Sequence, residues 1–266
     1  PRVAIVTLCD YDPLASPLTP LSASNKYRYA TRHGYRLYFE TSRADHSRPP
    51  AWGKLPAVLK YMKPGVDWVM WMDCDSFFMN DTLSLADLLP TDPAVDLVLS
   101  EDGLTVNTGV WFVRNTPWAR SLIQAWYGPP SSPFVTHPHW EQAAMQTMLT
   151  RARATADPYV PPVQSCGLRY DWKGVCGPPP AARPEDDILA KTVFLPQRWV
   201  NSYPPQLASK LRDREGASTH AEYTPGDFVV SFSGCGNILG KDTCSQLLNA
   251  YYDRAEEANA APCNTP

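Results

Sequence analysis

Blocks of apolar positions separated by polar ones run through the first 115 residues, and they predict strands that alternate with helices. Apolar runs at residues 2–9, 35–39 and 67–72 are typical of strands buried on both faces. Residues 24–33 and 52–62 are predicted as helices. Ser22 or Ser24 would be the N-cap of the first helix, and Gly34 would end it in a left-handed conformation. This alternation predicts an α/β fold, with a mostly parallel central sheet and helices on both faces.

The rest of the chain continues with mixed elements and offers no linker long enough to divide it. We expect strands at residues 95–99, 109–113, 192–195 and 227–232, and helices at residues 117–127, 139–152 and 243–257. Many of the 28 prolines cluster at residues 129–138, 158–162 and 178–184, which are therefore predicted as extended loops. A single domain over residues 1–266 follows.

Charge and hydropathy exclude two classes of partner within this sequence. The formal net charge is −3 and there is no basic run, which argues against a nucleic-acid partner held through its phosphates. No run of 18 apolar residues is present, so no membrane span is expected inside these limits. Because the sequence opens directly in a strand, we interpret it as a trimmed domain whose leader or membrane anchor lies outside it.

The cysteine spacing favours an oxidising compartment. Cys166 with Cys176 and Cys235 with Cys244 lie close together among Gly, Pro and polar residues, which suits loop disulfides. Cys9 and Cys74 follow apolar strands, where buried free thiols are expected. The seven cysteines cannot all pair internally, and seven reduced cytosolic thiols are the alternative.

The clearest chemical signal is a pair of carboxylates after the apolar run Trp68–Met72. Asp73 and Asp75 are separated by one residue, and side chains at i and i+2 of an extended chain point the same way. Two such carboxylates repel each other unless a cation lies between them. Hard divalent cations favour oxygen ligands and can bind carboxylate and phosphate oxygens together. The pair therefore indicates a metal-held diphosphate. A solvated turn with two ordinary aspartates is the alternative.

Other polar residues follow or open predicted strands and are weaker candidates. Asp10 and Asp102 come just after strands, and Asn107 opens one at Asn107-Thr108-Gly109, where a capping turn is the alternative. Glu141 and Gln142 begin a predicted helix, where the helix dipole alone favours the acidic residue. The run Gly226 to Cys235 ends in a turn of small residues that suits close approach to a phosphate, although a core strand with a disulfide loop explains it too.

Taken together, these segments resemble glycosyltransferase family 34, which contains galactosyl-, xylosyl- and mannosyltransferases. The resemblance covers nearly the whole chain. It is carried by Asn25-Lys26-Tyr27 to Gly34-Tyr35, Arg48 to Lys54, Trp68 to Asp75, Asp96-Leu97-Val98, Asn107 to Asn115, Trp118, Trp140-Glu141-Gln142, Gln197 to Asn201, and Gly226 to Val230.

The resemblance implies a GT-A fold, a divalent metal (Mn²⁺ or Mg²⁺), a nucleotide-sugar donor such as a UDP-sugar, and transfer with retention to a glycan or glycoprotein. It assigns the donor to about residues 1–115 and the acceptor to about 116–266, in a Golgi or other secretory lumen, from a type II membrane protein. By likeness, Asp73, Asp75 and Ser231 would be metal positions. Lys54, Thr7 and Asp10 would join the two aspartates in binding the donor, and Asp102, Asn107, Glu141 and Gln142 would surround the reacting sugar.

Two departures from the family pattern keep other functions open. Ser231 stands where the family usually has a histidine metal ligand, and Gly236 stands where a basic residue often follows Gly-Cys. A hydroxyl is a far poorer transition-metal ligand than imidazole. A catalytically silent binding module of the same shape is therefore the main alternative. A nucleotidyltransferase is a weaker one, because no glycine-rich basic loop for a triphosphate is present.

Overall fold

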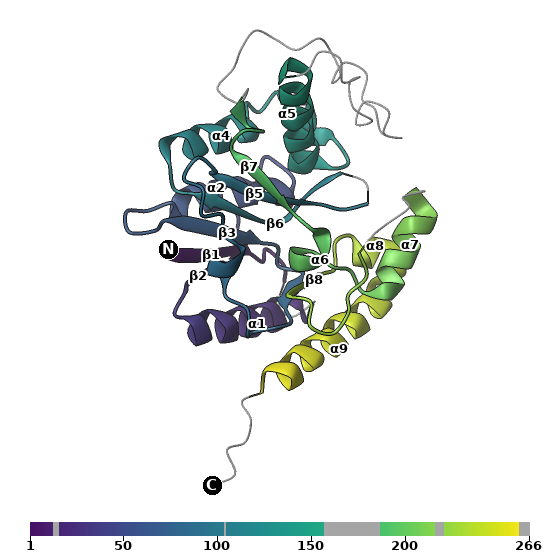
Figure 1. The fold of residues 1–266 in the computed structure, drawn as a ribbon. Coiled ribbons are helices and arrows are strands. Elements are labelled where there is room, and N and C mark those ends of the chain that lie inside the picture. The colour runs from purple at the N-terminus through teal and green to yellow at the C-terminus, as the bar shows by residue number, and fades with distance from the viewer. Residues whose placement is uncertain (13–15, 104, 157–186, 216–220, 261–266) are drawn as a thin grey trace.

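A six-stranded sheet forms the centre of the protein in the computed structural model, which describes residues 1–12, 16–103, 105–156, 187–215 and 221–260 (Figure 1). The strand order is β2-β1-β3-β6-β5-β7. Only β6 runs against its neighbours, since β1 is parallel to both β2 and β3, and β5 is parallel to β7. The strands are β1 (Val3–Leu8), β2 (Arg36–Glu40), β3 (Trp68–Met72), β5 (Leu97–Glu101), β6 (Val106–Arg114) and β7 (Thr192–Leu195). The predicted mostly parallel sheet is confirmed.

Helices cover both faces of this sheet, because the inner strands alternate apolar side chains between two cores. Trp71 and Trp111 pack on the face covered by α2, α4 and α5, while Trp68 and Phe112 pack on the face covered by α1. These helices are α1 (Leu18–His33), α2 (Lys54–Tyr61), α4 (Pro117–Tyr127) and α5 (Trp140–Ala156). The short elements are η1 (Pro50–Gly53), α3 (Leu85–Leu88) and η2 (Pro133–Thr136).

A smaller layer beside the main sheet contains β4 (Ser76–Phe78) paired antiparallel with β8 (Val229–Ser231). It carries a third apolar core that includes Phe77, Phe232 and Tyr251. The surrounding helices are α6 (Gln197–Val200), α7 (Pro205–Glu215), α8 (Cys235–Leu239) and α9 (Lys241–Asn259). Since β4 follows directly after the Asp73–Asp75 turn, this layer holds the turn from the side away from β3.

The start of α1 corrects the predicted cap. The helix begins at Leu18 after Pro17, and neither Ser22 nor Ser24 caps it, because both lie inside the helix and their hydroxyls are bonded elsewhere. Gly34 ends α1 with φ 69°, as predicted, in the left-handed region that glycine enters without steric cost.

The disulfides correct one cysteine prediction and confirm another. Cys9 and Cys74 are bonded to each other and are not free thiols, because β1 and β3 are neighbours and their ends bring the two Cα atoms to 5.2 Å. Cys235 and Cys244 form the predicted loop disulfide. The predicted Cys166–Cys176 pair and the loops at 158–162 and 178–184 lie outside the described residues.

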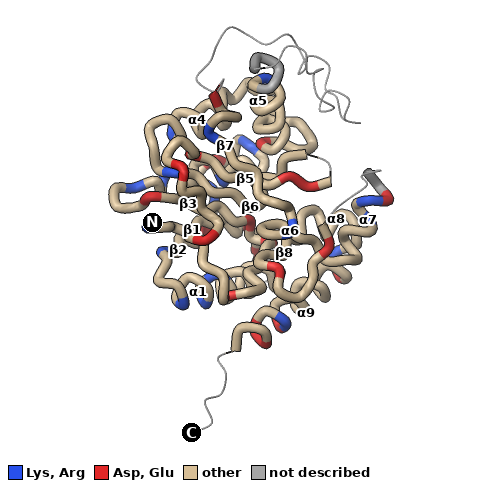
Figure 2. The backbone as a smooth tube through the Cα atoms, viewed as in Figure 1, with Lys and Arg blue, Asp and Glu red and all other residues tan. Residues whose placement is uncertain are grey.

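Figure 2 shows basic and acidic residues distributed over the helices and strands, with both signs present throughout. A local excess of carboxylates therefore reflects the site where it occurs and is not a property of the whole chain. In the portion of the chain that the structure describes, no helix combines the length and the apolarity needed to cross a bilayer.

Candidate active site

Polar residues from four strands meet at one edge of the main sheet. β1, β3 and β5 run in the same direction, so the residues that follow them, Asp10, Asp73 and Asp102, lie at the same edge. β6 runs the opposite way, and its beginning, with Asn107, therefore reaches that edge too. This is where ligands bind in open α/β sheets.

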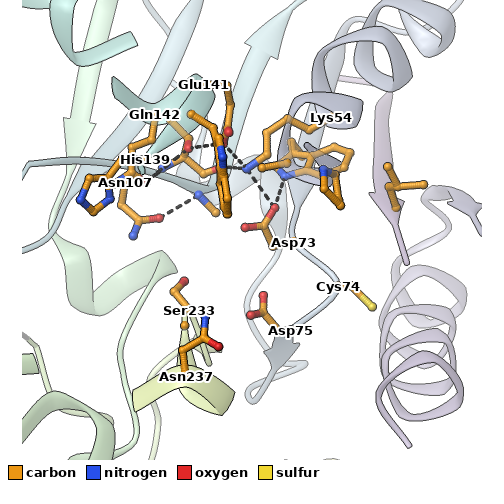
Figure 3. A pocket seen from close by; sticks show the side chains of 18 of the residues that line it. Lys54, Asp73, Cys74, Asp75, Asn107, His139, Glu141, Gln142, Ser233 and Asn237 are labelled. Carbon is orange, nitrogen blue, oxygen red and sulfur yellow. Dashed lines mark hydrogen bonds and ion pairs between the residues drawn. The ribbon is translucent and has the colours of Figure 1, made fainter. Parts of the chain in front are cut away.

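A cavity of about 640 Å³ opens at this edge, between the main sheet and α8. Figure 3 shows Lys54, Asp73, Glu141, Gln142 and Asn107 on one side of it, and Asp75 facing Ser233 and Asn237 on another. The charged groups that line the cavity are mostly negative. Of the described residues around it, five contribute carboxylates and one contributes an ammonium group; the carboxylates belong to Asp10, Asp73, Asp75, Asp102 and Glu141, and the ammonium group to Lys54.

Backbone and side-chain bonds hold the turn that carries the two aspartates. The N–H of Asp73 donates to the carbonyl of Gly109 at 2.7 Å, and the carbonyl of Asp75 accepts from Phe232 at 2.8 Å. Beneath the turn, the buried ammonium of Lys26 donates to the carbonyls of Cys74 (3.3 Å) and Ser76 (2.8 Å). The predicted pair of neighbouring carboxylates is thus fixed from both layers and from α1.

Lys54 is the centre of the ionic contacts. Its Nζ lies 2.8 Å from Glu141 Oε1 and 3.2 Å from Asp73 Oδ1, and it donates to the carbonyl of Thr108 at 3.1 Å. Lys54 and Glu141 are only 4% and 3% exposed. Burial acts to lower the pKa of Lys54, but the charges of Asp73 and Glu141 outweigh it and the pKa is raised. Lys54 is therefore a permanent cation that joins the sheet to α5.

Asp75 differs from Asp73 in having no such partner. Asp73 Oδ1 accepts from Trp71 Nε1 at 2.7 Å as well as from Lys54, whereas no side chain of a described residue forms a hydrogen bond or ion pair with the Asp75 carboxylate. Burial first, and then the charge of Asp73, raise the pKa of Asp75 to about 6. Burial likewise raises the pKa of Asp73. Burial hinders the ionisation of both carboxylates, and the charge of Asp73 adds to this at Asp75. A hard divalent cation would favour the ionised form of both.

The polar group at the start of β6 is a closed network. Asn107 Nδ2 donates to Asp102 Oδ2 at 3.1 Å and to the hydroxyl of Tyr203 at 2.9 Å, and Tyr203 donates to Asp102 at 3.0 Å. Gln142 Oε1 accepts from the N–H of Thr108 at 3.3 Å. Sequence reasoning missed Tyr203, which lies two residues beyond the family-like segment ending at Asn201, and it missed Lys26 as a support of the aspartate turn.

Three predicted residues take other positions. The carboxylate of Asp10 lines the cavity but pairs with Arg43 at 2.6 Å. Thr7 is fully buried in β1 and is not among the residues lining the cavity. Ser231 is also buried outside the lining, and its hydroxyl is hydrogen-bonded to that of Ser76 at 2.6 Å. The roles expected for these residues stay predictions, and this geometry adds no support for Thr7 or Ser231.

Residues 1–100 match the model of the galactosyl transferase GMA12/MNN10 family. This match covers the first 100 of the 266 residues. The chain is 25% identical over 243 residues to the probable alpha-1,2-galactosyltransferase gmh1 of Schizosaccharomyces pombe, covering 86% of this chain and 66% of that protein. It is 22% identical over 275 residues to the probable alpha-1,6-mannosyltransferase MNN10 of Saccharomyces cerevisiae, covering 90% of this chain and 60% of the relative. The chain thus spans a little under two thirds of the length of these relatives.

A solved structure has a similar fold. A glycosyltransferase involved in the glycosylation of the major capsid of PBCV-1 superposes with a TM-score of 0.57 at 15% identity, covering 94% of this chain and all of that one. Together with the sheet topology, this confirms the GT-A fold. In open α/β sheets ligands bind at the strand ends, which is where this cavity lies.

Proposed function

We propose that this chain is the catalytic domain of a glycosyltransferase that moves a sugar, with retention, from a nucleotide-sugar donor to a glycan or glycoprotein acceptor with the help of a divalent cation. The observation that carries the proposal is the charge of the cavity. A nucleotide diphosphate is anionic and would be repelled by five carboxylates facing one ammonium group. A divalent cation on Asp73 and Asp75 would offset their two negative charges and could bind phosphate oxygens directly.

Asp73 and Asp75 are the residues that would hold the cation, which would stabilise the negative charge of the departing diphosphate. No group of three His, Cys, Asp or Glu side chains suited to a metal occurs among the described residues. Donor phosphate and water would therefore supply the remaining ligands. Mn²⁺ and Mg²⁺ both suit such an oxygen-rich set.

The chain's own residues would orient the sugar. Gln142 Oε1 accepts from Thr108, which leaves its amide Nε2 without a bond to another described residue and available to a sugar hydroxyl. The acceptor oxygen forms a bond to the anomeric carbon on the face that the diphosphate leaves. The old carbon–oxygen bond breaks with its electron pair, and the hydroxyl proton passes to the departing phosphate oxygen. Gln142 and Asn107 would steady the sugar while positive charge develops on it.

Two disulfides support a secretory lumen as the working compartment, because such bonds persist in oxidising surroundings. A Golgi location and an anchor outside this chain are part of the proposal.

The test is a screen of UDP- and GDP-sugar hydrolysis, first with Mn²⁺ and then with Mg²⁺, on the wild type and on Asp75→Ala. We expect hydrolysis of at least one donor by the wild type and a loss of two to three orders of magnitude in Asp75→Ala, as is typical when a transition-state charge partner is removed (about 10²–10³). Unchanged hydrolysis in Asp75→Ala would refute the metal role.

The second candidate is a catalytically silent binding module with the same fold. It is favoured by Ser231, whose hydroxyl is bonded to Ser76 and does not line the cavity. Calorimetric titration with Mn²⁺ and several nucleotide sugars separates the two. Donor binding in the titration without hydrolysis in the screen above supports the silent module, whereas hydrolysis rejects it.

A further inference from the structure

Trp140 adopts a backbone conformation that does not suit its side chain. Its φ is +40°, and no other described residue except glycine has a positive φ. In the left-handed region the Cβ atom crowds the backbone, and a bulky residue there is a true outlier. Such strain persists where the surroundings impose it, and it gathers at ligand-binding sites.

The side chain of Trp140 leaves a substantial part of its apolar surface open to solvent. It lines the cavity and keeps 38% of its surface exposed, although an indole is among the most favourable groups to bury. The next residue, Glu141, is almost fully buried and tied to Lys54 and Thr108. The unusual φ therefore occurs at the point where the chain presents an indole to the cavity and then fixes a carboxylate behind it.

The surroundings of Trp140 suit a sugar ring. Figure 3 shows its sequence neighbours His139, Glu141 and Gln142 on the same side of the pocket as Asn107, opposite Asp75 and Ser233. This wall offers the amide of Gln142 to hydroxyls, and the indole adds one flat apolar surface. A pyranose carries hydroxyls around its edge and a patch of C–H groups on its face, so it matches both features.

Building on the proposed function, we propose that Trp140 is a sugar-binding residue whose indole stacks against the C–H face of a pyranose ring in the cavity. The ring can belong to the donor or to the acceptor, and the experiment below distinguishes them. The indole stays exposed because it contacts the ligand, and the positive φ of Trp140 lowers the stability of the fold locally.

The binding test uses saturation-transfer NMR with methyl α-D-mannopyranoside, methyl α-D-galactopyranoside and cellobiose, in parallel with calorimetry using UDP and UDP-sugars in Mn²⁺. The variants are Trp140→Ala, Trp140→Gly and Trp140→Phe. Trp199→Ala is the control, because Trp199 is also exposed (51%) but does not line the cavity. We expect sugar affinity to fall about tenfold or more in the Ala and Gly variants, to be partly kept by Phe, and to be unchanged in the control.

The melting temperature separates a ligand-binding tryptophan from a purely structural one, because replacing a structural tryptophan would lower it in both variants. Glycine relieves the positive φ and alanine does not, so Trp140→Gly should melt about 2–4 °C above Trp140→Ala. A loss of several degrees in both variants, with sugar binding intact, overturns the proposal.

The remaining outcomes are also decisive. No sugar contact in the wild type, or equal contact in all variants, overturns the proposal, as does a loss of affinity for UDP itself. If only UDP-sugar binding falls, the ring belongs to the donor; if only free-sugar binding falls, it belongs to the acceptor. Sugar contact through Trp140 in a protein that binds no nucleotide supports this inference and rejects the proposed function.

Discussion

The disulfide between Cys9 and Cys74 joins the end of β1 to the middle residue of the Asp73–Asp75 turn. The two cysteines are 65 residues apart in sequence, and the bond therefore ties the first strand of the sheet to the candidate metal site. It acts together with Lys26, which bonds the carbonyls on either side of Asp75 from below. The position of the two carboxylates consequently depends on both a covalent bond and the buried side chain of Lys26.

Replacing Cys9 by Ala should weaken ligand binding at the Asp73–Asp75 turn without changing any residue of that turn. Loss of a cross-link over this loop length costs about 2–4 kcal/mol of unfolding free energy. The affinity for UDP in Mn²⁺ should fall with it, because the turn is no longer tied to β1. Urea unfolding and calorimetry measure the two effects. An unchanged midpoint and an unchanged affinity in Cys9→Ala would contradict the prediction.

Replacing Lys26 by Met should destabilise the fold by about 1–3 kcal/mol, because the buried carbonyls of Cys74 and Ser76 lose their donor. The loss should also depend on pH. Burial, opposed by the charges of Asp75 and Asp73, lowers the pKa of Lys26 to about 7 from its ordinary 10.5.

A depressed lysine pKa contributes stability that is fully present above 10.5 and is lost as the pH falls through 7. The difference in unfolding free energy between wild type and Lys26→Met should therefore be larger at pH 9 than at pH 6. Urea titrations at the two values measure it. A difference that is constant over this range would show that Lys26 titrates normally.

Breaking the ion pair of Lys54 with Glu141 should cost far more than removing both partners. Lys54→Met leaves two carboxylates in a buried site, and such a change costs about 3–5 kcal/mol. The double variant Lys54→Met/Glu141→Met should be less destabilised than the sum of the single variants. A double-mutant cycle by urea unfolding gives the coupling. Simple additivity would mean that the two charges do not stabilise each other.

Cation binding should weaken in acid because Asp75 takes up a proton. Burial and the charge of Asp73 raise its pKa from 3.8 to about 6. The stability linked to this shift is fully present below pH 3.8 and is lost as the pH rises through 6, so the ionised pair is the less stable form and gains most from a cation. The dissociation constant for Mn²⁺ measured with UDP should rise about tenfold per unit below pH 6.

Asp75→Asn is the matched variant for that measurement. It should bind Mn²⁺ weakly at every pH, and in the absence of metal it should melt above the wild type at pH 7.5, because an amide removes the repulsion with Asp73. A wild-type affinity that is flat between pH 5 and 7.5 would contradict the shifted pKa.

Local pattern alone predicted much of the main sheet. Trp68–Met72 is apolar at every position, which is typical of a strand buried on both faces, and this predicted the Asp73–Asp75 pair at the end of that strand. Gly34 as the end of α1 followed from the same kind of local reasoning. The start of α1 did not, because Ser22 satisfies its hydroxyl through Lys26 inside the helix and needs no capping role.

The tertiary structure decided which distant residues meet. Nothing local distinguishes a free Cys9 from a bonded one; the pairing follows from β1 and β3 being neighbours in the sheet. The same holds for Tyr203 closing on Asn107, for Lys54 bridging Asp73 and Glu141, and for Ser231 turning to Ser76. Hydrophobic periodicity and the ends of strands depend on neighbouring residues, so the sequence alone predicts them. Ion pairs, disulfides and raised pKa values depend on contacts between residues far apart in the chain. These contacts exist only once the sheet has brought its strand ends to one edge.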